Sequence, residues 1–268
     1  MAHSATATTF AERYESTLVP VIFRPWAKEL IQRANPRDGE AILDLACGTG
    51  AVTMELAAAG VRPASLTCID INPDMLAVAE ARAREAGVSA TFHEASADSL
   101  PLHNASVELA FCQQALQFFP DKVKALHELH RVMVPGGRVA FCVSTALSDN
   151  PLLDAQARTL EKHAGAEAGN AVRAICSLTD PGMIRELFEE AGFSHVEVER
   201  VSLALTHPDA RTFAAGAMGG MHTGDKLSPL SDAERGVCIA EFLSALGECF
   251  DGTALHFPHV SNVITARA

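Results

Sequence analysis

A short run in the first fifth of the chain constrains the fold more than any other feature. It extends from Ile42 to Gly50 and reads ILDLACGTG, followed by a segment with helical character at 51–59. Gly48 and Gly50 lack the Cβ atoms that would keep a ligand away from the backbone, and they tolerate positive φ. The run therefore predicts a strand that turns sharply into a helix and offers backbone N–H groups to a ligand.

A second apolar run follows that helix and ends in an acid. Residues 66–69 read LTCI, and Asp70 comes next, twenty residues after Gly50. The carboxyl ends of parallel strands meet at one edge of a sheet, so Asp70 is expected beside the glycine turn. A carboxylate there can accept hydrogen bonds from both hydroxyls of a ribose, as in many nucleotide-binding sheets.

Strand-like runs alternate with helical patterns through the middle of the chain. Strands are predicted at 41–45, 65–69, 90–93, 107–112 and 137–144, and helices at 51–59, 74–86 and 121–133. Because parallel neighbours need crossover helices, this alternation predicts an α/β fold with a doubly wound, mostly parallel sheet. Later predicted elements are helices over 149–177, 179–191 and 209–250 and strands at 195–205 and 257–267.

Two further segments complete a family pattern. Residues 96–101 read SADSLP, and residues 129–138 read LHRVMVPGGR. With the run from Asp44 to Gly50 and the stretch after Asp70, they resemble class I S-adenosylmethionine (SAM)-dependent methyltransferases of the ubiquinone/menaquinone-biosynthesis type. The resemblance covers roughly residues 10–145. Two residues depart from the family pattern: Ala46 replaces a glycine, and Ser96 stands where an Asp usually accepts from the adenine amino group.

The resemblance implies a fold and a division of the chain. The fold is Rossmann-like, with a seven-stranded sheet whose last strand is reversed and a helical cap over the substrate. An N-terminal helical arm or lid is expected over 1–35, a SAM-binding core over 36–148, and cap helices with the last two strands over 149–268.

The resemblance also assigns residues to SAM. Asp70 takes the ribose hydroxyls, Ile71 and Met75 enclose the adenine, and Gln113 meets the methionine amine. Simpler explanations stay open, since Asp70 could cap the helix at 74–86 and Met75 could belong to the core. The full expected cofactor set is Asp44, Ala46, Gly48, Gly50, Asp70, Ile71, Met75, Ser96, Ala97, Cys112, Gln113 and Gln117.

Methyl transfer from a sulfonium is an in-line displacement, in which the protein chiefly positions donor and acceptor. No fixed catalytic residue is therefore expected, although a histidine near the cap could act as general base. The candidates are His207, His222, His256 and His259. Expected residues of the lid and acceptor pocket are Tyr14, Phe23, Trp26, Leu152, Met183, Phe213, Met218, Met221 and Phe242.

The composition and charge of the chain argue against some classes of partner and of binding site. A formal net charge of −12, without a basic stripe, argues against a nucleic-acid partner and leaves a small, partly apolar acceptor. His127 with His130, and His256 with His259, lack a carboxylate at ligand spacing, so no metal site is predicted.

The seven cysteines form no Cys-x-x-Cys pair and suit a reduced, cytoplasmic protein. No apolar run reaches membrane-spanning length, no secretory signal is recognised, and a homodimer stays open.

Two other functional classes stay open. A SAM-fold enzyme of different chemistry, or a non-catalytic SAM-binding protein, would carry the same motifs. A nicotinamide-dependent oxidoreductase is disfavoured, because Thr53 stands where its third glycine is expected.

Overall fold

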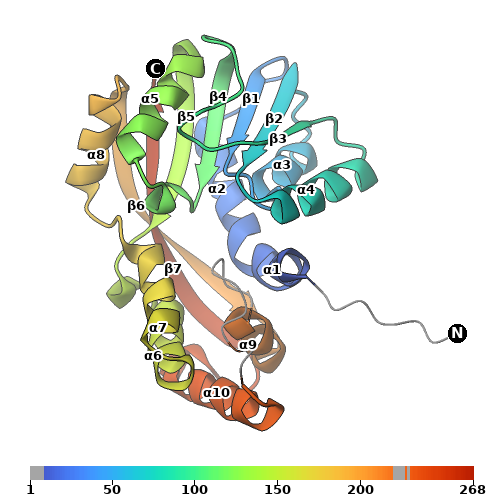
Figure 1. Cartoon of the computed structure of the whole chain (residues 1–268), viewed down its shortest axis with the longest axis vertical. Helices are drawn as coiled ribbons and strands as arrows, with labels where there is room; N and C mark the ends of the chain where they lie inside the picture. Colours follow the sequence, from blue (N-terminus) through green and yellow to red (C-terminus); the bar gives the residue numbers. More distant parts are fainter. Residues whose placement is uncertain (1–8, 220–226, 228–229) are drawn as a thin grey trace, which may run out of the picture.

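The computed structural model describes residues 9–219, 227 and 230–268. Its central feature is a seven-stranded sheet in the order β3-β2-β1-β4-β5-β7-β6 (Figure 1). The first five strands pair in parallel, whereas β7 runs antiparallel to both β5 and β6. The predicted doubly wound sheet with a reversed last strand is thus confirmed. The strands are β1 (Ala41–Leu45), β2 (Ser65–Asp70), β3 (Thr91–Glu94), β4 (Val107–Gln113), β5 (Met133–Ser144), β6 (Ser194–His207) and β7 (Leu255–Arg267).

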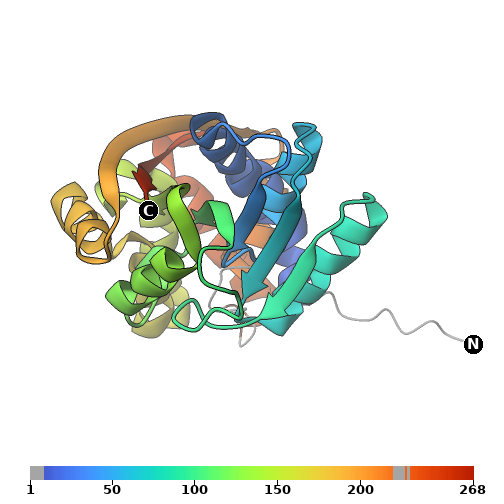
Figure 2. The same cartoon turned by 90° about the horizontal axis from the view of Figure 1, so that it is seen from above.

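Helices cover both faces of this sheet, as the view from above shows (Figure 2). Along β1, Ile42 belongs to one buried cluster and Leu43 to the other, because successive side chains point to opposite faces. Burial on both faces explains why the central strands read as nearly unbroken apolar runs. The helices of this layer structure are α2 (Arg24–Ala34), α3 (Ala51–Ala58), α4 (Pro73–Glu85), α5 (Lys122–Val132) and α8 (Pro181–Glu190).

The N-terminal segment is helical, as expected, but it contains a break in helical type. Helix α1 (Phe10–Leu18) starts with a capping box made by Thr9 and Glu12, and a π-helical turn, Val19–Phe23, separates it from α2. Pro20 and Pro25 explain the turn, since neither residue can donate to a carbonyl in the preceding turn. Helix α2 packs against the sheet and α3, whereas α1 lies against α9 and α4.

The cap is built on a continuation of two strands. Strand β5 pairs with β7 only from Arg138 to Ser144, but β6 and β7 stay paired as far as His207 and Leu255. This two-stranded ribbon extends beyond the rest of the sheet, and the cap helices gather around it (Figure 1). They are α6 (Pro151–Ala164), α7 (Ala166–Arg173), α9 (Ala210–Gly219) and α10 (Asp232–Ala245). None of the helices in the described ranges is both long and apolar enough to cross a membrane.

Candidate active site

A cleft of about 410 Å³ opens at the carboxyl ends of β1, β2 and β4. Strands β1 and β4 are neighbours at the point where the strand order reverses, which is where open α/β sheets bind ligands. The predicted cofactor residues that line this cleft are Ala46, Gly48, Asp70, Ile71, Met75, Ser96, Ala97 and Gln113.

The glycine turn is held in place by Asp44, which lies in β1 just before the turn. This buried carboxylate accepts from the backbone N–H of Thr53 at 3.1 Å and from its hydroxyl at 2.8 Å, which fixes α3 to β1. Burial raises the pKa of Asp44 to about 6, against the lowering effect of the Thr53 hydrogen bonds. Asp44 lines only a small recess beside the cleft, so its contacts position the turn.

The two glycines serve different purposes. Gly48, with φ of +55°, lines the cleft, and a Cβ added there would enter open space. Gly50, with φ of +82°, lies where α3 begins, and an added Cβ would lie 3.4 Å from the Cβ of Ala79 on α4. Gly50 is therefore explained by its backbone conformation and by the close approach of α4.

Asp70 lies at the end of β2 and joins the two halves of the cleft floor. Its Oδ2 accepts from the backbone N–H of Gly48 at 2.8 Å, and its Oδ1 accepts from that of Asn72 at 2.9 Å. Burial raises the pKa of Asp70, and these backbone bonds oppose the rise. The cap of α4 is Asn72, which accepts from the N–H groups of Asp74 and Met75, so Asp70 is not the helix cap.

Apolar and polar groups meet at the outer end of the cleft. Met75 is buried, whereas Ile71 is 69% exposed at the rim. The sequence analysis missed Asp98, which also lines the cleft, two residues beyond Ser96. Hydrogen bonds from Ser96 and from Lys124, whose Nζ lies 2.9 Å from Oδ2, hold the pKa of Asp98 below its usual value. A carboxylate is therefore present at this end despite the serine at position 96.

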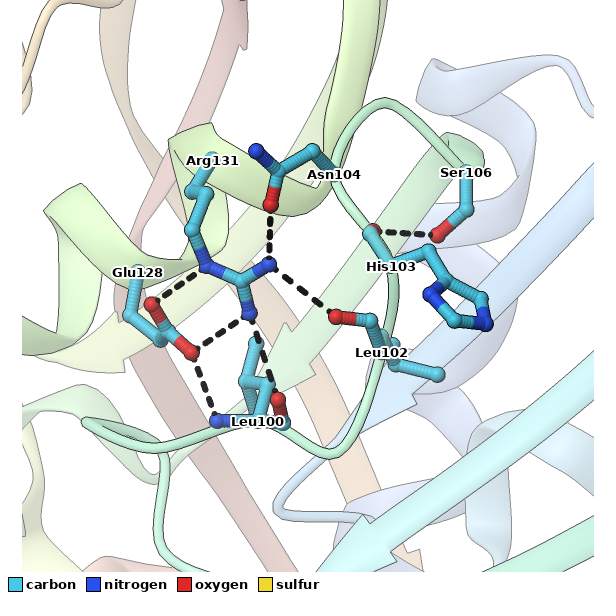
Figure 3. A network of polar contacts seen from close by, with 7 residues as sticks. All are labelled: Leu100, Leu102, His103, Asn104, Ser106, Glu128 and Arg131. Atoms are coloured by element: carbon cyan, nitrogen blue, oxygen red, sulfur yellow. Dashed lines mark hydrogen bonds and ion pairs between the residues drawn. The ribbon is translucent and has the colours of Figure 1, made fainter.

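A single arginine anchors the loop that follows Asp98 (Figure 3). The guanidinium of Arg131 on α5 forms a paired interaction with Glu128 and donates to the carbonyls of Leu100 and Leu102. It also donates to Oδ1 of Asn104 at 2.6 Å, and Glu128 accepts from the backbone N–H of Leu100 at 2.8 Å. The two family segments at 96–101 and 129–138 therefore form one hydrogen-bonded unit.

The end of β4 supplies amide groups. Gln113 donates from Nε2 to the carbonyl of Phe23 at 2.8 Å, and its buried Oε1 has no partner among the described residues. An acceptor without a partner in the cleft wall fits the amine of SAM. The Cys112 side chain is fully buried, and burial raises its thiol pKa well above the usual value, so only its backbone can face a ligand. Gln117 donates to the carbonyl of Gln114 and is not among the cleft-lining residues.

A second, smaller cavity of about 80 Å³ lies between the N-terminal helices and the cap. We call it the chamber. Tyr14, Gln114 and Phe118 line both the cleft and the chamber, so the two spaces adjoin. The complete lining of the chamber is Tyr14, Leu18, Ile22, Phe23, Gln114, Phe118, Ser144, Leu152, Leu153, Gln156, Ile175, Ala217 and His259.

The aromatic residues of the N-terminal segment divide into two groups. Tyr14 and Phe23 line the cavities, with ring centroids 4.9 Å apart. Burial, together with the nearby Asp70, raises the pKa of Tyr14, so its hydroxyl stays protonated. Trp26 instead is fully buried in the core and donates from Nε1 to Nδ1 of His259 at 2.9 Å. The expectation that Trp26 faces the ligand is therefore corrected, because its ring is buried in the core and lines neither the cleft nor the chamber.

Several residues expected in the acceptor pocket lie elsewhere. Met183 is 55% exposed on α8, which packs against β6 and α5, and it lines neither the cleft nor the chamber. Phe213, Met218 and Phe242 are buried and are absent from the chamber lining, where Leu152 is found as expected. Met221 and His222 lie outside the described residues.

The remaining histidines occupy different environments. His207 binds the backbone of Asp209, and His256 lies 3.4 Å from Asp251 at the surface, and neither lines the cleft or the chamber. Of the three candidates within the described residues, His207, His256 and His259, only His259 is found in the chamber wall. Over the described part of the chain, no group of three or more His, Cys, Asp or Glu side chains is arranged to hold a metal ion.

Known proteins share both the sequence pattern and the architecture. A family model described as a methyltransferase domain matches residues 42–137. A ubiquinone/menaquinone biosynthesis C-methyltransferase (UbiE) of Rhizobium etli is 37% identical over 135 residues, covering 49% of this chain and 52% of the relative. The chain thus spans about half the length of that relative.

A longer match extends into the cap. The UbiE protein of Methylobacterium nodulans is 33% identical over 190 residues, covering 65% of this chain and 75% of the relative. Among solved structures, YcgJ of Bacillus subtilis aligns with a TM-score of 0.60 at 17% identity, covering 90% of this chain and 97% of YcgJ, which supports the fold. The chain belongs to the class I SAM-dependent methyltransferases of the ubiquinone/menaquinone biosynthesis type.

Proposed function

We propose that this protein transfers the methyl group of SAM to a small, partly apolar acceptor held in the chamber. The observation that carries this proposal is the junction of the two cavities. Tyr14, Gln114 and Phe118 belong to both walls, so a donor in the cleft and an acceptor in the chamber would meet at these side chains.

The cleft has suitable groups for each part of SAM. The Asp70 carboxylate keeps lone pairs for the ribose hydroxyls, since the backbone N–H groups that it accepts from, among them those of Gly48 and Asn72, do not use all the acceptor sites of its two oxygens. The partnerless Oε1 of Gln113 suits the methionine amine. Met75 and Ile71 offer apolar contacts to the adenine, and Asp98 offers an acceptor to its amino group.

The chemistry requires positioning more than it requires acid or base groups. SAM supplies an activated methyl group, and orienting donor and acceptor can lower the barrier by about 7–11 kcal/mol. Tyr14 and Phe23 would exclude water from the junction. We propose that α1 acts as a lid, held closed by the ion pair of Glu15 with Arg82, whose guanidinium also donates to the carbonyl of Thr49 at 2.8 Å.

The acceptor class follows from the chamber and from the relatives. The chamber wall is mainly aliphatic and aromatic, and the relatives are named for ubiquinone and menaquinone biosynthesis. Since an apolar cavity that binds benzene measures about 150 Å³, even an acceptor with one aromatic ring needs α1 or the cap to move before it enters this chamber of about 80 Å³. The charge of −12 argues against a nucleic-acid acceptor, and seven free cysteines suit a reducing compartment such as the cytoplasm.

The test begins with the cofactor. We expect calorimetry to detect binding of SAM and of S-adenosylhomocysteine, and we expect Asp70→Ala to weaken both. Incubation with methyl-labelled SAM and a set of hydroxylated aromatic compounds should then release S-adenosylhomocysteine together with a labelled product.

The alternatives predict different results. A non-catalytic SAM-binding protein would bind the cofactor and give no S-adenosylhomocysteine with any acceptor. An enzyme transferring another part of SAM would release a nucleoside product other than S-adenosylhomocysteine. No binding of SAM at millimolar concentration would refute the proposal.

A further inference from the structure

One histidine in the chamber wall has a fixed protonation pattern. His259 is only 4% exposed and lies on the part of β7 that pairs with β6 beyond the end of β5. Its Nδ1 lies 2.9 Å from Nε1 of Trp26, and the two rings meet edge to face with centroids 5.8 Å apart. Trp26 is fully buried, so this contact is shielded from water.

The tryptophan determines which nitrogen of His259 carries the proton. An indole N–H can only donate, so the facing Nδ1 must present its lone pair. The neutral ring then carries its single proton on Nε2. Protonation of Nδ1 would bring two N–H donors into opposition, and burial alone already lowers the pKa of His259 to about 4. The ring is therefore neutral near pH 7, with an N–H donor at Nε2.

Three other polar side chains of the chamber wall, Ser144, Gln114 and Gln156, are engaged with protein groups. Ser144 donates to Oε1 of Gln114 at 3.0 Å, and Gln114 donates from Nε2 to the hydroxyl of Ser261 at 2.8 Å. Gln156 donates to the carbonyl of Ala217 at 2.9 Å. In contrast, Nε2 of His259 has no hydrogen-bond partner within the described part of the chain, although the residue lines the chamber.

We propose that His259 positions the acceptor by donating its Nε2–H to an uncharged carbonyl or a phenolic or enolic oxygen. This inference rests on the proposed function, because it assigns the acceptor to the chamber. It makes His259 a positioning residue and removes it as a general base, since Nδ1 is engaged with Trp26 and the remaining nitrogen, Nε2, already holds the proton. The same donor disfavours an ammonium group, which offers N–H donors and no lone pair.

The tautomer is tested first, on the full chain with ¹⁵N-labelled histidine. We expect the ¹⁵N resonances of His259 to report a neutral ring protonated at Nε2 from pH 5.5 to 8. In Trp26→Phe, which removes the indole N–H and keeps an aromatic ring, we expect a mixture of tautomers. An Nδ1-protonated ring, or a charged ring at pH 6, in the unaltered protein would overturn the proposal.

Ligand selectivity is tested with three probes of similar shape, added to protein saturated with S-adenosylhomocysteine. Acetophenone offers a carbonyl, ethylbenzene has no polar group, and 1-phenylethylamine is an ammonium at neutral pH. We expect acetophenone to bind about tenfold more tightly than ethylbenzene, as one hydrogen bond allows. It should also shift the Nε2–H resonance of His259, and the amine should bind most weakly.

Two variants separate donation from packing. His259→Leu removes the donor and should make acetophenone and ethylbenzene bind equally. His259→Gln can place an amide N–H near the position of Nε2 and should restore part of the preference. If acetophenone loses no preference in His259→Leu, or if the amine binds best, the proposal fails.

If His259→Leu does not fold, the ¹⁵N resonances of His259 in Trp26→Phe still test the proposal. Binding of S-adenosylhomocysteine, measured first by calorimetry, separates the two proposals. If the unaltered protein does not bind S-adenosylhomocysteine, the methyltransferase function is refuted. If it binds S-adenosylhomocysteine but binds the three probes equally well, only the role of His259 is refuted.

Discussion

The backbone N–H of Gly48 donates to Oδ2 of Asp70 at 2.8 Å, joining the turn after β1 to the end of β2. The acid expected to hold the ribose therefore also fixes the glycine turn that approaches the ligand. Its other oxygen accepts from the N–H of Asn72, the residue that caps α4. One carboxylate thus organises both sides of the cleft before any ligand arrives.

Replacing this carboxylate should weaken SAM binding. Asp70→Ala removes the ribose acceptor and leaves two backbone donors without their partner, so we expect a loss of about 1.5–3 kcal/mol, or roughly ten- to a hundred-fold in Kd. Asp70→Asn keeps the shape without the charge and should fall between. Asp74→Ala, an exposed acid on α4, is the matched control and should bind normally. Calorimetry of folded variants decides, and unchanged affinity in Asp70→Ala would refute the ribose assignment.

Gly48→Val should abolish SAM binding while the protein still folds. The side chain would enter open space in the cleft, and φ of +55° adds strain on the order of 1–3 kcal/mol. Gly60→Val is the control, since Gly60 has φ of +77°, equally open surroundings and no place in the cleft lining. Both variants should lower the midpoint of urea unfolding, but only Gly48→Val should lose SAM. Equal SAM affinity in the two variants would place the ligand elsewhere.

Asp44 should make stability depend on pH. Its pKa of about 6 exceeds the ordinary aspartate value of 3.8, so between these pH values the folded state holds a proton that the unfolded state has released. The contribution of Asp44 to the free energy of unfolding therefore falls as the pH rises from about 4, and it levels off above about pH 6.

The variant Asp44→Asn isolates that effect from Asp70 and Glu15, whose pKa values are also raised by burial. We compare the free energy of unfolding of Asp44→Asn with that of the unaltered protein. Between pH 4 and pH 7, we expect the unaltered protein to lose roughly 2–3 kcal/mol more than the variant loses. Urea unfolding without SAM at several pH values measures it. A difference that stays constant with pH would contradict the raised pKa.

Arg131 should not be replaceable by lysine. Its planar guanidinium donates hydrogen bonds to Glu128, to Asn104 and to the carbonyls of Leu100 and Leu102 (Figure 3). A lysine ammonium cannot reproduce this geometry. We expect Arg131→Lys to cost about 2 kcal/mol in unfolding free energy. Faster amide exchange over 98–106 should accompany the loss. Arg84→Lys, an exposed position on α4, should change neither quantity.

Some interpretations from sequence were limited by what a local pattern contains. Asp74 and Asn72 both suit the start of α4, and only the structure identifies Asn72 as the cap. Ser96 signalled a missing acid, but the carboxylate of Asp98 lines the same cleft through the turn of the loop. An apolar stripe on a helix does not say which neighbour it meets, so Met183 was expected in the cap although it is exposed on α8.

The sequence by itself determined the order of strands and helices, the glycine turn and the acid at the end of β2. These features depend on the period of apolar residues and on glycine chemistry, both of which act over a few neighbours. Only the tertiary structure decided that Trp26 and His259, 233 positions apart, form one hydrogen bond, and that Arg131 holds the loop at 100–104. Such contacts arise because elements distant along the chain pack side by side, and no local pattern encodes which side chains then meet.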